Sequence, residues 1–343
     1  MKSSITFSEY FHNWLYGEDG YYANYKVIGK GGDFYTAVSS SRFFGGSIGK
    51  RVVDVIKEGF LPNDTTIVEI GAHHGYLIAD MVEFIYTLKP ELLRTLKFAI
   101  VERYEHLQIK QKEYFQKCFG DEVQIIHYND ISEVKLQSAF VVANEIFDAF
   151  SCDLVYTNEN NTLQYAIVEK DKIEFVDINN DKESLNKHCS KYNITKGEVS
   201  VGYEEFALNM CKNIEKFEFV TFDYGEQYPR NDFSCRIYEK HNVYPIFDED
   251  IELKKLFGKS DITYDVNFSH LIDSFKKAGA KHLIYQTQLK ALVEFGIIEL
   301  LEILHKNVDE KTYLSEANKV KTLLNPTGMG DRFKMASFRK EQD

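Results

Sequence analysis

The sequence predicts an α/β fold in which a mostly parallel sheet is covered by helices on both faces and interrupted by an inserted α+β subdomain. Two observations lead to this prediction. From Thr66 onward, short apolar runs alternate with helix-length runs, as in a parallel sheet with helical crossovers. The alternation stops after about residue 152 and resumes at 217. With 343 residues, 44% of them hydrophobic, the chain can bury a substantial core.

The first half of the chain is expected to contribute one helix, a long loop and the beginning of the sheet. Residues 4–16 carry apolar side chains at close to helical spacing, and a loop rich in glycine and aromatic residues follows them. The elements expected next are a strand at 66–70, a helix at 74–88, a strand at 97–102, a helix at 104–117, and strands at 123–127 and 139–144.

The second half contains the predicted insertion and the rest of the sheet. Residues 153–178 alternate apolar and polar side chains between Asn-rich turns, which indicates antiparallel strands, and residues 180–216 are predicted to be helical and polar. The sheet resumes with a strand at 217–225, a helix at 267–278, a strand at 281–285, helices across 288–323 and a strand at 333–340. The expected division is a segment at 1–65, a main domain at 66–152 and 217–343, and an inserted subdomain at 153–216.

The charge balance limits the classes of partner. Lys and Arg total 41 against 53 Asp and Glu, a formal net charge of -12. This balance argues against broad contact with nucleic acid or an anionic membrane surface, because both need a positive face. It suits a cationic ligand or a basic protein segment. The helices within 287–323 are amphipathic and offer either core contacts or a homo-oligomer interface.

The cysteines and the apolar runs indicate a cytoplasmic protein without a metal site or membrane insertion. The five cysteines are scattered and form neither C-x-x-C nor a Cys/His cluster with metal-ligand spacing. We therefore expect reduced thiols and no bound metal. No apolar run approaches the length needed to span a bilayer, and the N-terminus lacks the pattern of a signal peptide.

The stretch VEIGAHHGYLIADM, residues 68–81, runs from a strand through a glycine turn into a helix. A dinucleotide loop would read G-x-G-x-x-G, whereas the centre of this turn is Ala72, His73 and His74. An imidazole at His73 would crowd a pyrophosphate. A ligand with a single carboxylate, such as S-adenosylmethionine, needs less close contact with the helix N-terminus. Without further signals, an ordinary strand-to-helix turn would explain Gly71 and Gly75 equally well.

Polar residues also follow the next two strands. Glu102 ends an apolar strand, where a carboxylate of an α/β nucleotide site binds both ribose hydroxyls; alone, it could be a solvated acid. It lies 27 residues beyond Gly75, somewhat farther than in a dinucleotide fold (102 − 75). Asn129 and Asp130 are candidates for the adenine edge, although an Asx turn is about equally expected.

A third polar group ends the strand in VVANEIFDAF, residues 141–150, and contains Asn144, Glu145 and Asp148. Polar groups at the carboxyl end of a central strand point into the crevice where open α/β sheets bind ligands. Two carboxylates three residues apart could hold a guanidinium. A helix N-cap with an acid in its first turn explains the same residues, so both interpretations stay open.

Together these residues resemble a known family, the MidA-like S-adenosylmethionine-dependent methyltransferases, relatives of a mitochondrial complex I assembly factor that methylates an arginine. The resemblance rests on an ordered set of motifs over nearly the whole chain. They are YGEDGYY (16–22), GGDFYTA (31–37), RFFGG (42–46), VEIGAHHG (68–75), NEIFDAF (144–150), DYG (223–225), CRIYEKH (235–241) and LLNPTGMGDRFK (323–334).

The resemblance implies a Rossmann-like class I methyltransferase with a seven-stranded sheet, S-adenosylmethionine as cofactor and S-adenosylhomocysteine as product. It implies that residues 1–65 include a segment that covers the cofactor. Glu145 and Asp148 would act on the acceptor, with Asp33 as an alternate catalytic acid. The implied cofactor-binding residues are Gly32, Phe34, Thr36, Glu69, Gly71, Ala72, His73, Gly75, Glu102, Asn129, Asp130 and Asn144. This chain departs from the family pattern at His73, where glycine is usual, and at Ser151, where proline is common.

The predicted function is methylation of an arginine side chain in a protein substrate, such as a subunit of respiratory complex I. The alternative is a non-catalytic assembly or binding protein that retains the fold. An NAD-dependent dehydrogenase is disfavoured by His73 and by the long interval before Glu102.

Overall fold

The computed structural model describes residues 4–24, 36–178, 182–239 and 242–342. The chain forms two compact units, which we call the sheet unit (35–146, 206–223 and 275–343) and the insert unit (1–34, 147–205 and 224–274). These bounds differ from the predicted division: the N-terminal helix and residues 224–274 group with the insertion, and residues 206–216 group with the sheet.

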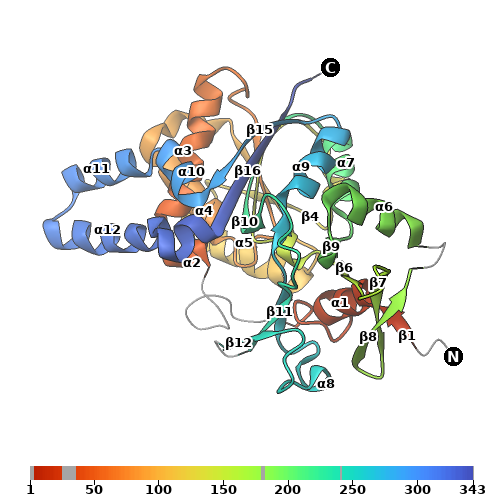
Figure 1. Cartoon of the computed structure of the whole chain (residues 1–343). Coiled ribbons are helices and arrows are strands. Elements are labelled where there is room, and N and C mark those ends of the chain that lie inside the picture. The colour runs from red at the N-terminus through yellow and green to blue at the C-terminus, as the bar shows by residue number, and fades with distance from the viewer. Residues whose placement is uncertain (1–3, 25–35, 179–181, 240–241, 343) are drawn as a thin grey trace. The chain divides into compact units, whose positions relative to one another are not determined.

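The sheet unit contains the predicted, mostly parallel sheet (Figure 1). The strand order is β15-β16-β10-β5-β2-β3-β4. The pairings from β10 to β4 are all parallel, whereas β15 and β16 pair antiparallel at the other end. The strands are β2 (Thr66–Ile70), β3 (Lys97–Val101), β4 (Ile125–Tyr128), β5 (Leu136–Asn144), β10 (Ile214–Glu226), β15 (Lys281–Thr287) and β16 (Phe333–Lys340). The predicted fold class is confirmed.

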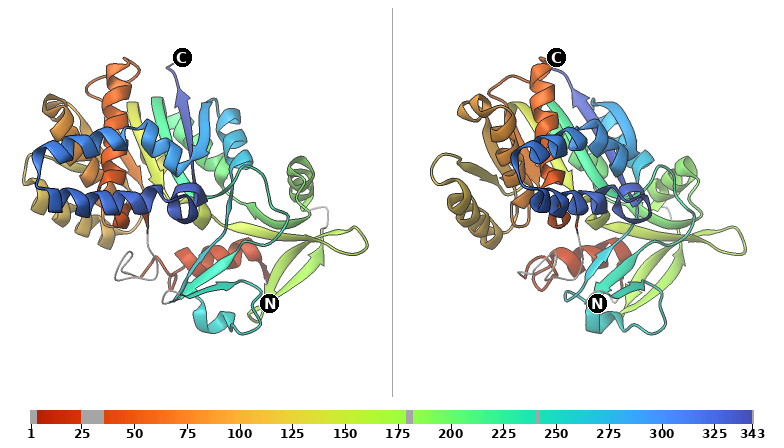
Figure 2. Two further views of the ribbon diagram at one scale, coloured as in Figure 1. Left: turned by 60° about the vertical axis from the view of Figure 1, so that its left-hand side comes forward. Right: turned by 90° about the vertical axis from the view of Figure 1, so that its left-hand side faces the viewer.

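Helices pack on both faces of this sheet, as Figures 1 and 2 show. Along β10, Phe222 faces Phe44 of α3, whereas Phe219 faces Phe206 of α7 and Phe275 of α9. Because side chains alternate across a strand, both faces of β10 are apolar. The helices are α2 (Ala37–Ser40), α3 (Phe43–Lys57), α4 (Tyr76–Leu88), α5 (Glu105–Phe119), α7 (Tyr203–Asn213), α9 (Phe268–Lys277), α10 (Gln288–Glu294), α11 (Ile297–Asn307) and α12 (Glu310–Leu324), with short turns at Pro90–Arg94, Ile131–Glu133 and Pro326–Gly330.

Helix α3 was not predicted from the sequence, and its glycines explain the RFFGG motif. A Cβ on Gly46 would lie 2.6 Å from the ring of Phe84, and one on Gly45 would lie 2.7 Å from Cβ of Asp80, both on α4. Since contacts below 3.0 Å require a neighbour to move, these glycines allow the two helices to approach closely. The helix that follows the candidate cofactor loop is therefore fixed along its length by α3.

A buried carboxylate ties α3 to the final strand. Glu218 on β10 is 1% exposed and accepts hydrogen bonds from Nε and Nη2 of Arg51, at 2.7 and 3.0 Å, and from Nε of Arg339 at 2.7 Å. Glu58, at the end of α3, accepts from both arginines at 2.9 Å. Both guanidiniums are thus paired, which offsets the cost of burying Glu218.

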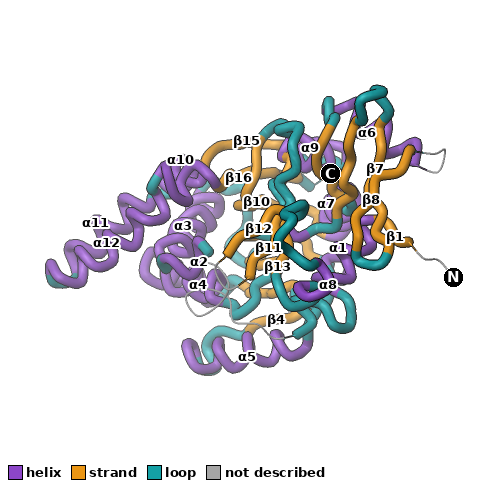
Figure 3. The backbone as a smooth tube through the Cα atoms, turned by 60° about the horizontal axis from the view of Figure 1, so that its bottom comes forward, coloured by secondary structure: helices purple, strands orange, loops and turns teal. Residues whose placement is uncertain are grey.

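The insert unit contains two small sheets (Figure 3). The predicted antiparallel strands are present in a five-stranded sheet with the path β1-β7-β6-β9, in which β8 pairs with β7. Its strands are β1 (Ser4–Thr6), β6 (Cys152–Thr157), β7 (Leu163–Glu169), β8 (Lys172–Asp177) and β9 (Lys196–Ser200). The prediction of helix throughout 180–216 is wrong in part, because β9 lies between α6 (Glu183–Tyr192) and α7. The first three residues of β9 are Lys196, Gly197 and Glu198, none of which has an apolar side chain. The strand therefore lacks the alternation of apolar and polar residues from which a strand is predicted.

The second small sheet was not predicted. Its order is β12-β11-β13, with β11 (Arg236–Glu239), β12 (Asn242–Pro245) and β13 (Asp261–Thr263). Short strands such as these give little periodicity to detect. The short helix α8 (Leu253–Leu256) lies between β12 and β13, and β14 (Val266–Asn267) pairs with the end of β10.

The predicted N-terminal helix is α1 (Phe7–Tyr16), which forms part of the insert unit's core. Thr6 and Glu9 form a capping box at its start. Trp14 is completely buried, and its Nε1 donates to the carbonyl of Ser260 at 2.7 Å. No helix within the described ranges is both long and apolar enough to cross a membrane.

Candidate functional site

The loop between β2 and α4 has a left-handed backbone at three positions. Gly71 has a φ of 73° and Gly75, the N-cap of α4, a φ of 76°. Between them, His73 has a φ of 46°, although L-residues other than glycine seldom adopt this region. Glycine adopts this conformation without strain, which agrees with the glycine that the resemblance implies at this position. The chain nevertheless keeps the backbone conformation that a glycine would favour.

Gly71 brings this loop close to the end of β5. A Cβ at Gly71 would lie 2.9 Å from Cγ2 of Ile146, closer than Cβ atoms are found in proteins. Strands β2 and β5 are parallel neighbours, so their carboxyl ends lie at the same edge of the sheet. The two polar segments predicted at these strand ends, at Gly71 and at Glu145, therefore meet within the sheet unit.

Glu69 lies beneath the loop, as predicted. Its side chain is 4% exposed, and Oε2 accepts the backbone N–H of Ile78 in the first turn of α4 at 3.0 Å. Burial raises the pKa of Glu69 to about 8; the hydrogen bond from Ile78 opposes this rise, and the charge of Glu102 adds to it. The Glu69 side chain thus connects β2 to the first turn of α4.

Glu102 follows β3 directly and is 7% exposed. Oε1 accepts the backbone N–H of Tyr104 at 3.1 Å, and Oε2 lies 3.5 Å from Nε2 of Gln111. Burial raises the pKa of Glu102 to about 6, against the lowering effect of these hydrogen bonds. A carboxylate has about four lone-pair sites, so Glu102 retains capacity for the two hydroxyls of a ribose.

Gln111 of α5 connects the two predicted cofactor elements and was missed by the sequence analysis. It is completely buried, and its Nε2 donates to the carbonyl oxygen of His73 at 2.8 Å. Its Oε1 is 2.9 Å from Nε2 of His127. Gln111 lies four residues after Leu107 and four before Phe115, so all three face the same, buried side of α5. A polar residue at such a position is unusual, and this could have identified Gln111 from the sequence.

Asn129 and Asp130 follow β4, and both have local partners. Oδ1 of Asn129 accepts from Nε2 of Gln108 at 2.9 Å, and Gln108 also donates to the carbonyl of Glu102 at 2.7 Å. Oδ1 of Asp130 accepts the backbone N–H of Ser132 at 2.9 Å and caps the short helix Ile131–Glu133. The Asx interaction considered from the sequence is thus present at Asp130, whereas Asn129 is coupled to the Glu102 backbone.

The polar end of β5 has a strained backbone. Glu145 has a φ of 55°, and its N–H donates to the carbonyl of Phe222 on β10 at 2.9 Å. Nδ2 of Asn144 donates to Oε1 of Glu145 at 2.8 Å, while Oδ1 of Asn144 is buried without a hydrogen-bond partner among the described residues. Left-handed backbone at non-glycine residues collects at functional sites. In the sheet unit, His73 and Glu145 carry it on neighbouring strands.

Asp148 belongs to the insert unit and lies in the short helix Phe147–Ala149. It is 4% exposed. Burial raises its pKa to about 7; the charge of Arg236 opposes this rise and that of Asp265 adds to it. Its backbone carbonyl accepts the N–H of Tyr264 at 3.2 Å, which fixes this segment to the unit's core.

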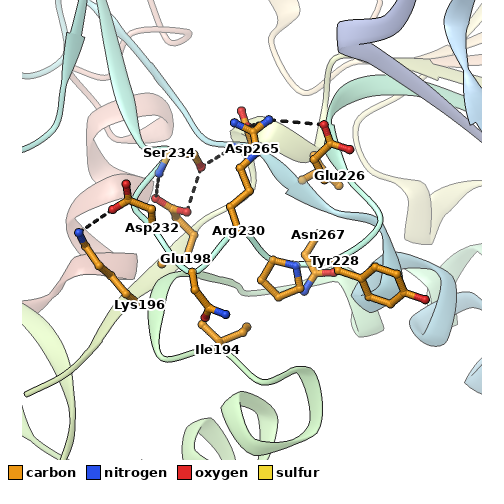
Figure 4. A pocket seen from close by; sticks show the side chains of 14 residues that line it. Ile194, Lys196, Glu198, Glu226, Tyr228, Arg230, Asp232, Ser234, Asp265 and Asn267 are labelled. Atoms are coloured by element: carbon orange, nitrogen blue, oxygen red, sulfur yellow. Dashed lines mark hydrogen bonds and ion pairs between the residues drawn. The ribbon is translucent and has the colours of Figure 1, made fainter.

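A polar pocket of the insert unit lies beside Asp265 and is shown in Figure 4. Asp265 accepts from Arg236 at 2.6 Å and pairs with Arg230 at 3.0 Å. Glu198 accepts the N–H and the Oγ hydroxyl of Ser234, at 2.8 and 2.9 Å, and burial raises its pKa to about 7. The pocket is thus lined by carboxylates that already hold guanidinium and hydroxyl groups.

Four of the remaining predicted site residues precede α2 in the sequence, and the fifth, Ala72, follows β2. Gly32, Asp33 and Phe34 lie outside the described residues. Thr36 is the N-cap of α2, and its Oγ1 accepts the N–H of Ser39 at 3.1 Å. Ala72 is 7% exposed, and its carbonyl accepts the N–H of Gly75 at 2.7 Å, which closes the cofactor loop.

Comparison with known families agrees with this geometry. Residues 47–286 match the model of a family described as "Putative S-adenosyl-L-methionine-dependent methyltransferase". The chain belongs to this methyltransferase family. The family predicted from the ordered motifs is therefore confirmed, and so is S-adenosylmethionine as the cofactor.

Relatives and solved structures match over most of the chain. The protein arginine methyltransferase NDUFAF7 of Danio rerio is 24% identical over 353 residues, covering 93% of this chain and 79% of the relative. The same protein of Xenopus laevis is 24% identical and covers 97% and 80%. A "likely methyl transferase" from Burkholderia thailandensis, bound to S-adenosyl-homocysteine, superimposes with a TM-score of 0.85 at 23% identity, covering 99% of this chain and 89% of that one. At this identity the superposition shows the fold.

The residues of this methyltransferase fit S-adenosylmethionine. Gly71 leaves free the space that a Cβ would fill between the loop and Ile146. The start of α4 presents the positive end of its dipole at the loop, which favours a carboxylate. The carboxylate of Glu102 could accept hydrogen bonds from a ribose, and Gln111 links it to the loop through the His73 carbonyl. The chemistry of the donors and acceptors therefore matches an amino acid at one end and a nucleoside at the other.

Proposed function

We propose that this methyltransferase transfers a methyl group to an arginine side chain of a protein, with a subunit of respiratory complex I as the candidate implied by its family. The observation that carries the proposal is the placement of Glu145. Glu145 directly follows the central strand β5, whose neighbour β2 leads into the loop assigned to the cofactor, and its backbone is left-handed. The names of the curated relatives, protein arginine methyltransferases, support the same acceptor.

The proposed cofactor contacts follow the geometry of the sheet unit. The loop from Gly71 to Gly75 would bind the amino-acid end, with Glu69 below it and Ala72 and His73 contributing backbone. Glu102 would bind the ribose, and Asn129 or Asp130 the adenine edge. Asn144, whose buried Oδ1 has no partner in the described part of the chain, would contact the cofactor near the reacting methyl group.

S-adenosylmethionine supplies a methyl group on a sulfonium, whose displacement leaves a neutral thioether and needs no further activation. What the protein must supply is alignment and a place for the proton. Pre-forming a neutral guanidine at pH 7 would cost roughly 7 kcal/mol, because the pKa of arginine is about 12.5 or higher. A carboxylate that orients the guanidinium and accepts its proton as the nitrogen–carbon bond forms avoids that cost.

We assign these two roles to Glu145 and Asp148. Glu145 would orient the guanidinium, because it directly follows β5 and the hydrogen bond from Asn144 holds its carboxylate in place. Asp148 would accept the proton, because burial brings its pKa to about 7, where a carboxyl group can both gain and lose a proton at neutral pH. Asp33, which lies outside the described residues, is the alternate acid.

The experiment is a methylation assay in lysate from cells that lack this protein, with isotopically labelled S-adenosylmethionine and mass spectrometry of the products. Wild-type protein is expected to label an arginine. Glu145→Gln and Asp148→Asn should each reduce the rate by about a hundredfold, in the range of a lost general acid–base group. Labelling of another residue type, or wild-type rates in both variants, would refute the assignment.

A matched control separates loss of chemistry from loss of fold. Glu122 is an exposed acid, so Glu122→Gln should keep the wild-type rate. All variants should still bind S-adenosylhomocysteine if only the acceptor chemistry is lost. The non-catalytic alternative predicts that the wild-type protein binds the cofactor but labels nothing. The left-handed backbone at His73 preserves the loop and agrees with cofactor binding under both readings, so the labelling result decides between them.

A further inference from the structure

Three potential metal ligands come together in the insert unit, on elements that the methyl-transfer chemistry does not use. His188 lies on α6, Glu204 in the first turn of α7 and His270 in the first turn of α9. One ligand atom from each lies within 4.8 Å of those of the other two. They are separated by 16 and 66 residues along the chain (204 − 188 and 270 − 204), so their spacing could not reveal the group, and the sequence predicted no metal site.

The two histidines face each other. Their ring centroids are 4.3 Å apart and the rings are nearly perpendicular, at 76°. Nε2 of His270 is 2.8 Å from Oε1 of Glu204. His270 is 2% exposed, whereas the side chain of Glu204 is 50% exposed. The group therefore has a buried inner wall and an open side through which an ion can enter and on which a water can complete its coordination.

The chemistry of these donors suits a zinc-like ion. Two imidazoles and one carboxylate form a common three-ligand zinc set that leaves a fourth position open. At metal–ligand distances of about 2.0–2.2 Å, tetrahedral ligand atoms lie roughly 3.4 Å apart. The separation between Nε2 of His270 and Oε1 of Glu204 is shorter, at 2.8 Å, and all three ligand atoms lie within 4.8 Å of one another. Rotation of the half-exposed Glu204 side chain can adjust them without moving a helix.

The protein fold does not use all the hydrogen-bonding capacity of His270. Its Nδ1 is buried and has no hydrogen-bond partner among the described residues. This nitrogen diverges from Nε2, which faces Glu204, so a water can bond to Nδ1 while Nε2 remains the ligand atom of the group. The neighbouring acid is already engaged, because Asp273 accepts from Lys191 at 2.5 Å and from Tyr192 at 2.9 Å. Glu204 is thus the carboxylate available to pair with the imidazoles.

We propose that His188, Glu204 and His270 form a binding site for a divalent zinc-class metal ion. The ion joins α6, α7 and α9 through one ligand from each helix. All three ligands belong to the insert unit and come from three different helices, so the ion has a structural role in that unit.

The test is zinc binding by untagged, full-length protein, measured by competition with a chromophoric chelator. The background variant Cys118→Ser removes the one exposed thiol among the described cysteines. In that background we expect one tight equivalent of zinc and a rise in melting temperature when zinc is added, since a ligand that binds only the folded state stabilises it. Cobalt should bind in place of zinc with an absorption spectrum typical of low coordination number.

The decisive variant is Glu204→Gln, because a half-exposed side chain can be changed without unfolding the protein. Loss of even an outer-shell partner weakens metal sites about 10- to 100-fold, so loss of this direct ligand should weaken zinc binding at least that much. His188→Asn should do the same. A matched control is His305→Asn with Glu310→Gln, which removes an exposed His–Glu pair 3.3 Å apart and should change nothing.

Two results would overturn the proposal. One is a background protein that binds no zinc beyond weak, multiple-site association. The other is Glu204→Gln and His188→Asn proteins that bind zinc as tightly as the background. S-adenosylhomocysteine binding by each variant verifies that the fold is intact, so a loss of zinc binding can be assigned to the site.

Discussion

The side-chain amide of Gln111 donates to the backbone carbonyl of His73 at 2.8 Å, and this bond joins the helix after β3 to the loop after β2. The same amide group lies 3.5 Å from the carboxylate of Glu102. One buried glutamine therefore sets the distance between the proposed binding points for the two ends of the cofactor. His73 has a left-handed backbone, and its carbonyl is fixed by Gln111, which lies outside the loop.

Replacing Gln111 with Leu should weaken both the fold and the cofactor site. The substitution removes the hydrogen bonds of the buried Gln111 side chain to the His73 carbonyl and to Nε2 of His127. Leaving a buried polar group unsatisfied costs about 1–3 kcal/mol, so the free energy of unfolding should fall by that amount. S-adenosylhomocysteine affinity should fall with it. Denaturant unfolding and calorimetry measure the two effects.

The control for this change is Gln116→Leu on the same helix, where the side chain is exposed. It adds the same apolar group without removing a buried hydrogen bond and should leave cofactor affinity unchanged. Equal cofactor affinity in Gln111→Leu and wild-type protein would show that the bridge does not position the loop.

Alanine at Gly71 should be far more harmful than alanine at Gly59. Both glycines have a φ close to 75°, so each substitution carries the cost of a left-handed alanine, about 1–2 kcal/mol. Only at Gly71 does the new Cβ meet a neighbour, Ile146, at 2.9 Å; at Gly59 nothing lies within 4 Å. Overpacking should add about 1–3 kcal/mol. Thermal or denaturant unfolding of the two variants gives the difference, and equal losses would contradict the close approach.

The stability of the protein should depend on pH through Glu69. Its folded-state pKa is about 8, against an ordinary value of 4.5, because the buried carboxyl favours its neutral form. Between these values the folded state binds more protons than the unfolded state. Stability from this group is therefore fully present below about pH 4.5 and is lost as the pH rises toward 8, at up to about 1.4 kcal/mol per pH unit.

Glu69→Gln removes this titration and should flatten the pH dependence over that window. The amide oxygen of glutamine can still accept the N–H of Ile78, so the start of α4 should remain capped. The measurement is the free energy of unfolding at pH 5 and pH 8 for both proteins. A variant whose loss of stability between the two pH values matches that of wild type would mean that Glu69 is ionised throughout.

Removal of Glu218 should destabilise the sheet unit. Glu218→Ala leaves the guanidiniums of Arg51 and Arg339 without their buried partner, and breaking such a pair costs about 3–5 kcal/mol. Glu58→Gln, which changes only the exposed acid of the same network, should cost much less. Chemical denaturation distinguishes them, and equal effects would mean that the buried carboxylate adds nothing.

The sequence predicted the sheet well because its strands are apolar and regularly spaced. The strands at 66–70 and 333–340 have the expected bounds, since each has an apolar run between clear polar ends. Helix α3 was missed because its glycines lower helix propensity, and they are present for contact with α4 rather than for the helix itself. The contact between α3 and α4 joins residues that are far apart in the sequence, so it cannot be recognised from the pattern of apolar residues within 43–57.

The candidate site could be predicted only where it lies at strand ends. Glu102 and Asn144 became candidates because polar residues at the carboxyl ends of parallel strands are exceptional, whereas Glu69 was implied by the resemblance. Gln111 was not found, since a single polar residue in a helix carries no spacing signal. The His188–Glu204–His270 group was excluded by spacing alone, yet folding brings the three residues together.

The central claim is that the loop at Gly71–Gly75 and the carboxylate of Glu102 form an S-adenosylmethionine site. Calorimetric titration of wild-type, Glu102→Ala and Glu122→Ala proteins with S-adenosylhomocysteine and with NAD tests it most directly. The predicted result is that each wild-type chain binds one S-adenosylhomocysteine and no NAD. Affinity for S-adenosylhomocysteine should be weaker by about tenfold or more in Glu102→Ala only, since charged hydrogen bonds contribute about 1.5–3 kcal/mol. Tight binding of NAD without S-adenosylhomocysteine, or unchanged affinity in Glu102→Ala, would contradict it.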